Sequence, residues 1–577
     1  MRGLGTGADA GRRSSPPDQP APDRPSPDQP SPGPGPAAGR PVPTRAFPGW
    51  LVAVVPVLAE LVVGGYRIAG PSLWRDEAAT ISGAARPAGA ILALTRNQDA
   101  VHGPYYLLLH PVIMAGGISA TALRLPSLIA MCLAAGLTAV LGRRLARGSG
   151  LPAPSAVGLL AGLLLVSVPL TTRYAQEARP YALTSLCAVL ASYLLVRAAA
   201  SGRWPWWAGY AAAMALTGAF NLFAVLLAIA HGVSLLLARR PAAARAPAGA
   251  GPDGTSPAET PSAGPQSVPR PVPGSLGRWL VSCVVAAVLL GPLAFYSLRQ
   301  AGQLNWVTTP TPSTVATLAR DFAGATLAIP VIAVLGWLGL LAGRGLRRGA
   351  GLSLAVVALP WLVLPPVVLI AASFAHPVYV ERYVVFCLPA LSLLAAAGLV
   401  WLVVLAGRAA HGRGMTGRSA ALASAAPSAL LALVVLAAVA GPQVQIRAAT
   451  ARADNLRAVS AVVAAHERPG DAVVYLPWDT AVVGMAYPAP FRRLANIGLA
   501  QSPVASATLR GLPVPAGVLI ARLRTVRRVW TVRWSHPLPG GGLTPAAAAE
   551  ARAIGALRLV GRWRISSVIL SLYAARR

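Results

Sequence analysis

Long apolar stretches fill most of this sequence, and short polar connections separate them. A run of about 18 or more apolar residues is long enough to cross a membrane as an α-helix. The pattern predicts about eleven such spans between residues 48 and 442. We place them at residues 50–69, 122–142, 151–170, 180–199, 204–219, 220–238, 278–297, 324–343, 351–373, 383–405 and 423–441. The predicted fold class is therefore an all-α polytopic membrane protein.

One further apolar segment, residues 104–118, is short and is interrupted by Pro111. We interpret it as a helix that lies at the membrane interface rather than as a span. Counting it as a span would invert the orientation of every later loop.

Residues 443–577 have a different pattern, in which helix-like and strand-like segments alternate. Residues 469–471, with the sequence Pro-Gly-Asp, form a turn signal between the first helix and the first strand. We expect a small extracytoplasmic α/β domain. Its predicted helices are residues 452–467 and 545–554, and its predicted strands are 472–476, 528–534 and 557–572.

Two segments are rich in proline and glycine and have little apolar surface to bury. Residues 1–47 are expected to be a disordered cytoplasmic tail, and residues 241–275 a disordered cytoplasmic linker. The tail lacks the short apolar core of a signal peptide. The first span, which begins at Trp50, is therefore expected to be an uncleaved anchor.

Composition supports a membrane protein. The 577 residues are 55% hydrophobic and 12% charged, whereas soluble proteins carry about 25% charged residues. The four cysteines, which lie in apolar segments without a metal-ligand spacing, are most simply small hydrophobic residues.

The net charge is +32, and all 50 basic residues are arginine, because the sequence contains no lysine. Within the membrane region, the arginine-rich connections are alternate loops, which the positive-inside rule assigns to the cytoplasm. This places the N-terminus in the cytoplasm and residues 443–577 outside a bacterial plasma membrane. Few aromatic residues accompany the arginines, so we expect no nucleic-acid partner.

Ionisable and aromatic residues gather in the predicted outer loops. These loops contain Leu-Trp-Arg-Asp-Glu at 73–77, His-Gly-Pro-Tyr-Tyr at 102–106, Arg-Tyr-Ala-Gln-Glu-Ala-Arg-Pro-Tyr at 173–181 and Glu-Arg-Tyr at 381–383. Charges at a membrane boundary are commonly functional, because burial without a partner is costly. Structural alternatives are an aromatic belt for Trp74, Tyr105 and Tyr106, and an ion-pair cluster of Glu177 with Arg173 and Arg179.

Taken in this order, the four motifs resemble the C-type (GT-C) glycosyltransferases, and specifically the bacterial relatives of protein O-mannosyltransferases and aminoarabinose transferases (glycosyltransferase family 39). The resemblance covers residues 48–442. It implies an enzyme that transfers a sugar, of mannose or pentose type, from a polyprenyl-phosphate donor to an acceptor hydroxyl with inversion. The acceptor stays open between a protein, a glycan and a lipid.

The resemblance also implies roles for individual residues. Asp76 matches the general base, assisted by Glu77. A departing lipid phosphate needs cationic stabilisation, which arginine supplies with two donors. The residues expected to bind the donor phosphate are Arg382, Arg179 and Tyr383, and those expected to position substrate are His102, Tyr105, Glu177 and Glu381.

Three points stay open. Some members of the resembled family use a divalent metal, but the acidic residues here have no spacing that fixes a site, so no ligands are assigned. A lipid or small-molecule transporter is the main alternative, and it would favour charges near the bilayer midplane. A scaffold for residues 443–577 is a second alternative, which leaves the charged outer motifs unexplained.

Overall fold

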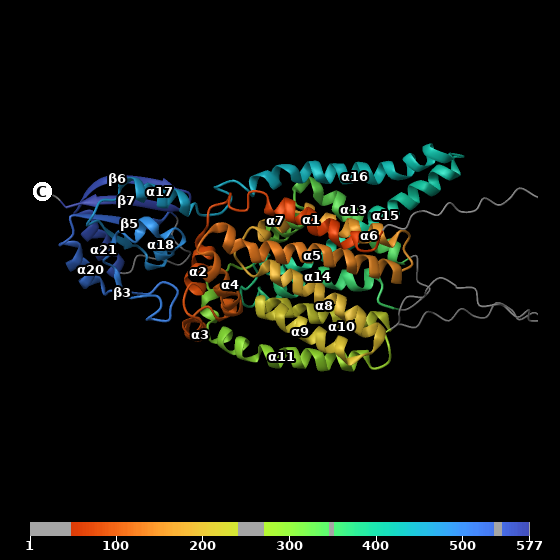
Figure 1. Ribbon diagram of the computed structural model, residues 1–577, viewed down its shortest axis with the longest axis horizontal. Coiled ribbons are helices and arrows are strands. Elements are labelled where there is room, and N and C mark those ends of the chain that lie inside the picture. The colour runs from red at the N-terminus through yellow and green to blue at the C-terminus, as the bar shows by residue number, and fades with distance from the viewer. Residues whose placement is uncertain (1–47, 240–270, 345–350, 536–544, 576–577) are drawn as a thin grey trace, which may run out of the picture. The chain divides into compact units, whose positions relative to one another are not determined.

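The computed structural model describes residues 48–239, 271–344, 351–535 and 545–575. The predicted tail at 1–47 and most of the predicted linker at 241–275 lie outside these residues. The described chain is mostly helical, with a smaller mixed α/β region near its C-terminus (Figure 1).

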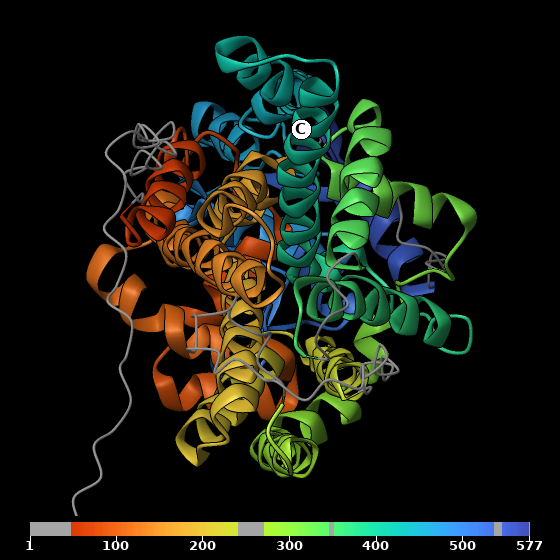
Figure 2. The same ribbon diagram turned by 90° about the vertical axis from the view of Figure 1, so that its right-hand side faces the viewer.

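Long helices packed side by side form a bundle (Figures 1 and 2). Several are broken or preceded by short 3₁₀ segments, notably η2 (Leu222–Leu226) and η5 (Glu381–Cys387). The bundle helices are α1 (Leu51–Gly65), α5 (Ala120–Gly148), α6 (Pro154–Ser167), α7 (Pro169–Ala175), α8 (Tyr181–Ser201), α9 (Trp204–Phe220), α10 (Leu227–Ala238), α11 (Ser275–Arg299), α12 (Pro312–Ala323), α13 (Ile329–Arg344), α14 (Leu354–Ala372), α15 (Leu388–Gly412) and α16 (Gly417–Gln445).

Each predicted span falls on one of these helices, but not all are long enough to count as spans by themselves. Within the described residues, six helices are long and apolar enough to cross a membrane, or up to eight if two bent pairs each count as one span. The predicted spans at 50–69, 204–219 and 220–238 fall on helices of at most 17 residues. At about 1.5 Å per residue, such helices are shorter than a bilayer core of about 30 Å. The number of eleven spans stays a prediction.

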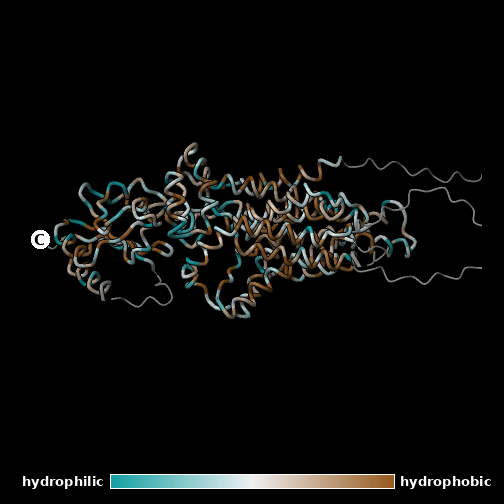
Figure 3. Tube along the Cα trace, turned by 90° about the horizontal axis from the view of Figure 1, so that it is seen from below, coloured by the Kyte–Doolittle hydropathy of each residue, from teal (hydrophilic) through white to brown (hydrophobic). Residues whose placement is uncertain are grey.

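The outer helices of the bundle present apolar side chains outward. Only 17% of the most apolar window of α11, and the same share of α16, is buried within the protein. Val288 and Leu422 are 70% and 72% exposed. Figure 3 shows hydrophobic residues (brown) along the bundle and hydrophilic ones (teal) in the C-terminal region. A large exposed apolar surface of this kind fits a multi-pass membrane protein.

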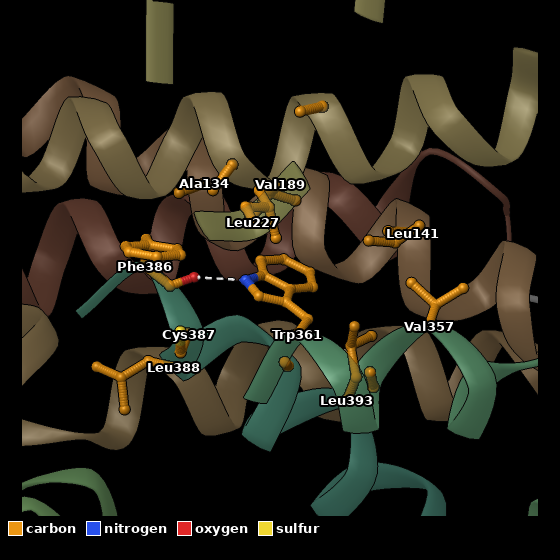
Figure 4. Close-up of a cluster of buried hydrophobic side chains, with 14 of the residues drawn as sticks. Ala134, Leu141, Val189, Leu227, Val357, Trp361, Phe386, Cys387, Leu388 and Leu393 are labelled. Carbon is orange, nitrogen blue, oxygen red and sulfur yellow. Dashed lines mark hydrogen bonds between the residues drawn. The ribbon is translucent and has the colours of Figure 1, made fainter. Parts of the chain in front are cut away.

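The centre of the bundle is a close-packed apolar core around Trp361 on α14. Its indole ring is completely buried, and its Nε1–H donates to the main-chain oxygen of Phe386 at 3.0 Å (Figure 4). This bond satisfies the one polar atom of the indole and fixes the end of η5 against α14. The arrangement bears on function, because η5 carries Glu381, Arg382 and Tyr383 at its other end.

The predicted first outer loop contains three helices, α2 (Arg75–Ala84), α3 (Ala88–Asn97) and α4 (Gly103–Gly116). The last of them coincides with the apolar segment at 104–118 that we interpreted as an interfacial helix. Helix α2 packs on α4, and Gly83 makes this possible, because a Cβ there would collide with the ring of Tyr106.

The C-terminal region contains a five-stranded sheet in the order β2-β1-β5-β7-β6, in which β2, β1 and β5 are parallel and β7 and β6 antiparallel. The predicted strand at 557–572 is in fact two strands, which turn at Ser566 with a φ of 47°. The strands are β1 (Ala472–Tyr475), β2 (Ala495–Asn496), β3 (Leu499–Gln501), β4 (Leu512–Pro513), β5 (Arg528–Trp534), β6 (Arg558–Ile565) and β7 (Val568–Ala574), and the helices are α17 (Leu456–His466), α18 (Val483–Ala486), α19 (Pro488–Phe491), α20 (Ala516–Leu523) and α21 (Pro545–Gly555).

One apolar core joins the C-terminal region to the helices of the first loop. Ile81 on α2 and Tyr105 on α4 belong to the same buried cluster as Val483, Trp530 and Leu570 of the C-terminal region. Packing is therefore continuous across the predicted domain boundary at residues 442 and 443. The position of α2 depends on both sides of that boundary.

We predict that Trp361→Ala lowers the free energy of unfolding by about 3–5 kcal/mol, because it empties a close-packed site. It also leaves the Phe386 carbonyl without its donor. Denaturation of the detergent-solubilised chain measures the change. The matched control is Trp50→Ala, since Trp50 is 64% exposed. Equal loss in both variants would contradict the central role of Trp361.

Candidate functional site

The candidate site lies at the start of α2, where Asp76 follows directly on the first helical residue. The side chain of Asp76 is 22% exposed. Asp76 thus lies in the first turn of α2, where an acidic side chain interacts favourably with the helix dipole. Asp76 therefore presents a partly accessible negative charge on a rigid element.

Two arginines from distant parts of the chain meet this carboxylate. Arg382 on η5 lies with Nη1 3.4 Å from Oδ2 of Asp76, and its Nε is buried without a hydrogen-bond partner among the described residues. Arg179, from the α7–α8 connection, donates through Nη1 to the main-chain oxygen of Asp76 at 3.4 Å. Three residues that we selected from three separate motifs thus come together.

His102 joins the same cluster through Arg179. Nη2 of Arg179 lies 2.5 Å from Nε2 of His102, and Nδ1 of His102 lies 2.6 Å from Oδ1 of Asp99. Since a guanidinium can only donate, Nε2 accepts, and the proton of the neutral ring lies on Nδ1 and is donated to Asp99. The Tyr106 hydroxyl donates to the other oxygen of Asp99. This chain of bonds fixes the orientation of Arg179.

Glu77 faces away from Asp76 and is completely buried. Its two oxygens accept from Nε and Nη2 of Arg124 on α5, both at 2.8 Å, and one also accepts from the main-chain nitrogen of Ala178 at 2.9 Å. Burial raises the pKa of Glu77, but the Arg124 guanidinium, the Ala178 N–H and Arg452 together outweigh burial, so the pKa lies below its ordinary value of 4.5. The structure does not bring Glu77 to the accessible part of the site.

Glu177 is likewise buried, between two arginines. Its Oε2 lies 3.8 Å from Nε of Arg173 and 3.6 Å from Nε of Arg452. These separations are too long for hydrogen bonds, and none of the three atoms has another hydrogen-bond partner among the described residues. Desolvation raises the pKa of Glu177. The sequence suggested an ion-pair cluster of Glu177 with Arg173 and Arg179. The structure pairs Glu177 with Arg173, but the second arginine is Arg452 and not Arg179.

The three remaining predicted residues have mixed environments. Tyr105 is completely buried in the core shared with the C-terminal region. The ring of Tyr383 packs on Phe223 with centroids 5.2 Å apart, while Glu381 is half-buried at the start of η5. Tyr383 and Glu381 flank Arg382 in sequence, and the Tyr383 ring packs η5 against η2. Tyr105 instead belongs to the apolar core.

A residue of the C-terminal region secures the start of α2. Trp74 provides no side-chain cap, and the carboxylate of Asp454 accepts instead from the main-chain nitrogen of Arg75 at 3.0 Å. The Arg75 side chain donates to both oxygens of Asp454, at 2.8 and 2.7 Å. The Ser567 hydroxyl donates to Asp454 as well. Asp454 therefore caps the helix that carries Asp76 and is itself completely buried.

Comparison with known proteins finds a family model and solved structures that are similar to this chain. Residues 102–249 match the family model for dolichyl-phosphate-mannose-protein mannosyltransferase. The structure of ArnT from Cupriavidus metallidurans in the apo state aligns with 91% of this chain and 98% of its own, at 15% identity and a TM-score of 0.53. The same protein bound to undecaprenyl phosphate aligns over the same shares at 14% identity and a TM-score of 0.54. Among curated proteins, none matches the sequence.

The matched family segment contains His102, Tyr105, Glu177 and Arg179, and the structural alignment spans the C-terminal region as well as the bundle. Residues 102–249 therefore resemble this mannosyltransferase family, and the chain has the same fold as ArnT. The low identity of the structural matches means that they support the shared fold alone.

A divalent metal does not fit the carboxylates of this site. Glu77 is occupied by Arg124, and Asp76 is paired with Arg382. Among the residues that the structure describes, no three or more His, Cys, Asp or Glu side chains are grouped so that they could hold a metal ion. We therefore assign no metal ligands.

Sequence reasoning missed four residues that organise this site, namely Asp99, Arg124, Arg452 and Asp454. Two left a signal: Arg124 is a charge close to the start of an apolar run, and Asp99 lies three residues before His102. The other two come from the C-terminal region, which is more than 250 residues distant from α7 and α2 in sequence. No local pattern could have connected them.

We predict that the two adjacent carboxylates differ in their effect on stability. Glu77→Gln leaves Arg124 buried without a counter-charge and should lower the free energy of unfolding by about 3–5 kcal/mol. Asp76→Asn should change it by less than about 1 kcal/mol, because the Asp76–Arg382 contact is long and partly exposed. Denaturation of both variants in the same detergent measures the difference.

The pH dependence supplies a control. Folding lowers the pKa of Glu77, so its ionised carboxylate stabilises the folded state in full at pH values above the ordinary pKa of 4.5. This stabilisation is lost as the pH falls through the lower pKa of the folded protein. The native chain should lose this stability in acid, and Glu77→Gln should not. Equal stability of the two chains at neutral pH would contradict the assignment.

A second prediction concerns the cap on α2. Asp454→Ala should lower the free energy of opening the first turn of α2 by about 1–2 kcal/mol. The equilibrium constant for opening would then rise by a factor of about 5–30. Faster hydrogen exchange at residues 75–84 measures it. Glu467→Ala is the control, because the ion pair of Glu467 within the described residues is with the exposed Arg493. Unchanged exchange in Asp454→Ala would show that the cap is not needed.

Proposed function

We propose that this protein is a GT-C glycosyltransferase that transfers a sugar from a polyprenyl-phosphate donor to an acceptor hydroxyl on the extracytoplasmic side of a bacterial plasma membrane. The observation that carries the proposal is the contact between Asp76 and Arg382, with Arg179 bonded to the main chain of Asp76. A partly exposed carboxylate and two fixed guanidinium groups within one site suit a reaction that removes a proton and expels an anion.

The acceptor side of the reaction needs a base. An alcohol is a poor nucleophile, and a carboxylate within hydrogen-bond reach can take its proton as the oxygen attacks the anomeric carbon. We assign this role to Asp76, because it is the accessible carboxylate of the pair. Glu77 acts by position, since its bonds to Arg124 and Ala178 hold the first turn of α2 against the bundle.

The donor side needs positive charge. As the new bond forms at the anomeric carbon, the bond between that carbon and the phosphate oxygen breaks, and the lipid phosphate leaves as an anion. Arg382 is our first choice for this phosphate, because its buried Nε has no partner among the described residues. Arg179 follows, oriented by His102. A single displacement of this kind inverts the anomeric configuration.

The substrate classes come from the relatives. The matched family model is described by its dolichyl-phosphate-mannose substrate, and ArnT was solved with undecaprenyl phosphate. Both names contain a polyprenyl phosphate, so we propose this class as donor, with a sugar of mannose or pentose type. The acceptor is a hydroxyl of a protein, a glycan or a lipid.

The transporter alternative is weaker. Transport favours ionisable groups along the span interiors. Here Asp76, Arg179 and Arg382 lie where helices begin or connect. Their grouping around one carboxylate favours chemistry over passage of a substrate.

The experiment measures sugar transfer from a panel of polyprenyl-phosphate sugars in membranes that contain the native chain or a variant. We expect the native chain to consume one donor, and Asp76→Asn to be slower by about a thousandfold, within the range for loss of a general base. Glu467→Gln, which removes a carboxylate paired with an exposed arginine, should keep full activity. Full activity of Asp76→Asn would refute the assignment of the base.

A further inference from the structure

A groove in the C-terminal region has a lining that no step of the proposed reaction uses. Its volume is about 190 Å³, and it lies between β1, α18, α19 and the segment from Asn496 to Arg510. Apolar side chains such as Met485 and Phe491 form part of it, and Tyr475, Asn496 and Arg510 add polar groups. None of its lining residues is acidic.

Two polar atoms of the groove lack hydrogen-bond partners in the part of the chain that the structure describes. Nε of Arg510 and Oδ1 of Asn496 are buried and have no hydrogen-bond partner among the described residues. Leaving such groups unpaired is costly, and a ligand that supplies the missing bonds removes the cost. A second guanidinium, that of Arg492, lines the same groove and is exposed.

Gly484 keeps the groove open beside Tyr475. The side chain of Tyr475 is 6% exposed, and a Cβ at position 484 would collide with its hydroxyl. Because glycine stands there, the phenol can extend to the groove. The two guanidinium groups and the phenol can donate to an oxyanion. Oδ1 of Asn496 can only accept, so it matches a hydroxyl on an attached ring of about the size of a sugar.

The groove is tied to the helix that carries Asp76. Arg86, just after α2, donates to the main-chain oxygens of Pro503 and Thr508 at 3.2 and 3.1 Å, and Ser82 on α2 donates to that of Leu509 at 2.6 Å. Helix α18, which contains Gly484 and Met485, packs on α2. Ser82 lies six positions after Asp76 on α2, which corresponds to about 9 Å along the helix axis.

We propose that this groove binds a phosphate or carboxylate group carried on a ring, and that it is a subsite for an anionic acceptor. The second part rests on the proposed function. The donor phosphate is assigned to Arg382, which comes from the bundle, whereas the groove belongs to the C-terminal region that packs on α2. An acceptor held there lies beside the helix whose first turn presents the base.

Binding tests the groove without any transfer reaction. The probe is phenyl phosphate, titrated onto the full chain in detergent and followed by ligand-observed NMR. Benzoate distinguishes a carboxylate from a phosphate, and phenyl glucoside is the neutral ring. We expect at least one of the two anions to bind and the glucoside to bind at least tenfold more weakly. Equal binding of the glucoside would overturn the proposal, as would no binding of either anion.

Substitutions in the groove test whether the anion binds there. Arg510→Gln should weaken binding of the anion at least tenfold, and Tyr475→Phe should weaken it severalfold. Arg524→Gln is the control, because Arg524 is exposed in the same region and does not line the groove. If Arg510→Gln fails to fold in a thermal unfolding test, Tyr475→Phe decides. Unchanged binding in the folded variants would overturn the site.

Transfer kinetics then test the role as acceptor subsite. With an anionic acceptor, Arg510→Gln should raise the acceptor KM at least tenfold and leave the donor KM and kcat within about twofold. An unchanged acceptor KM would refute the acceptor role but keep the binding site. Failure of the proposed base is distinguishable, because it appears as an active Asp76→Asn and does not alter binding in the groove.

Discussion

The buried guanidinium of Arg124 is the interaction on which the site depends. Besides its two bonds to Glu77, it donates to the main-chain oxygens of Ile68, Pro71 and Ser72, at 2.8, 3.0 and 3.2 Å. Glu77 in turn accepts from Ala178. One buried ion pair thus joins four parts of the chain. They are α5, the connection between α1 and α2, α2 itself and the connection that carries Arg179. Burying two charges is costly, and the cost is offset here because every N–H of the guanidinium donates.

The ion pair between Arg124 and Glu77 gives the two neighbouring carboxylates, Asp76 and Glu77, different environments. On a helix, adjacent residues point about 100° apart, so residues 76 and 77 cannot face the same partner. Glu77 faces the bundle and is neutralised there, which leaves Asp76 facing the accessible side with Arg382. The pairing that makes Glu77 unsuitable as a base is what holds Asp76 in place.

The C-terminal region stabilises α2 from the side opposite to the bundle. Asp454 caps its first turn, Ser82 and Arg86 bond to the segment that lines the groove, and Ile81 packs into the shared core. Helix α2 has only ten residues, too few to be stable alone in water. Its geometry is therefore set by tertiary contacts from the bundle and from the C-terminal region together.

The sequence by itself determined the helical class, the helix behind each predicted span and the motifs that meet at Asp76, because apolar runs and charges beside them are local signals. It also located the first strand and the long central strand of the C-terminal region, but merged the last two, since the turn at Ser566 has no glycine or proline to mark it. Only the tertiary structure decided that Glu77 is buried against Arg124, that Glu177 lies between Arg173 and Arg452, and that Asp454 caps α2. Those pairings join residues far apart in the chain, and which charge finds which partner depends on packing that no local pattern records.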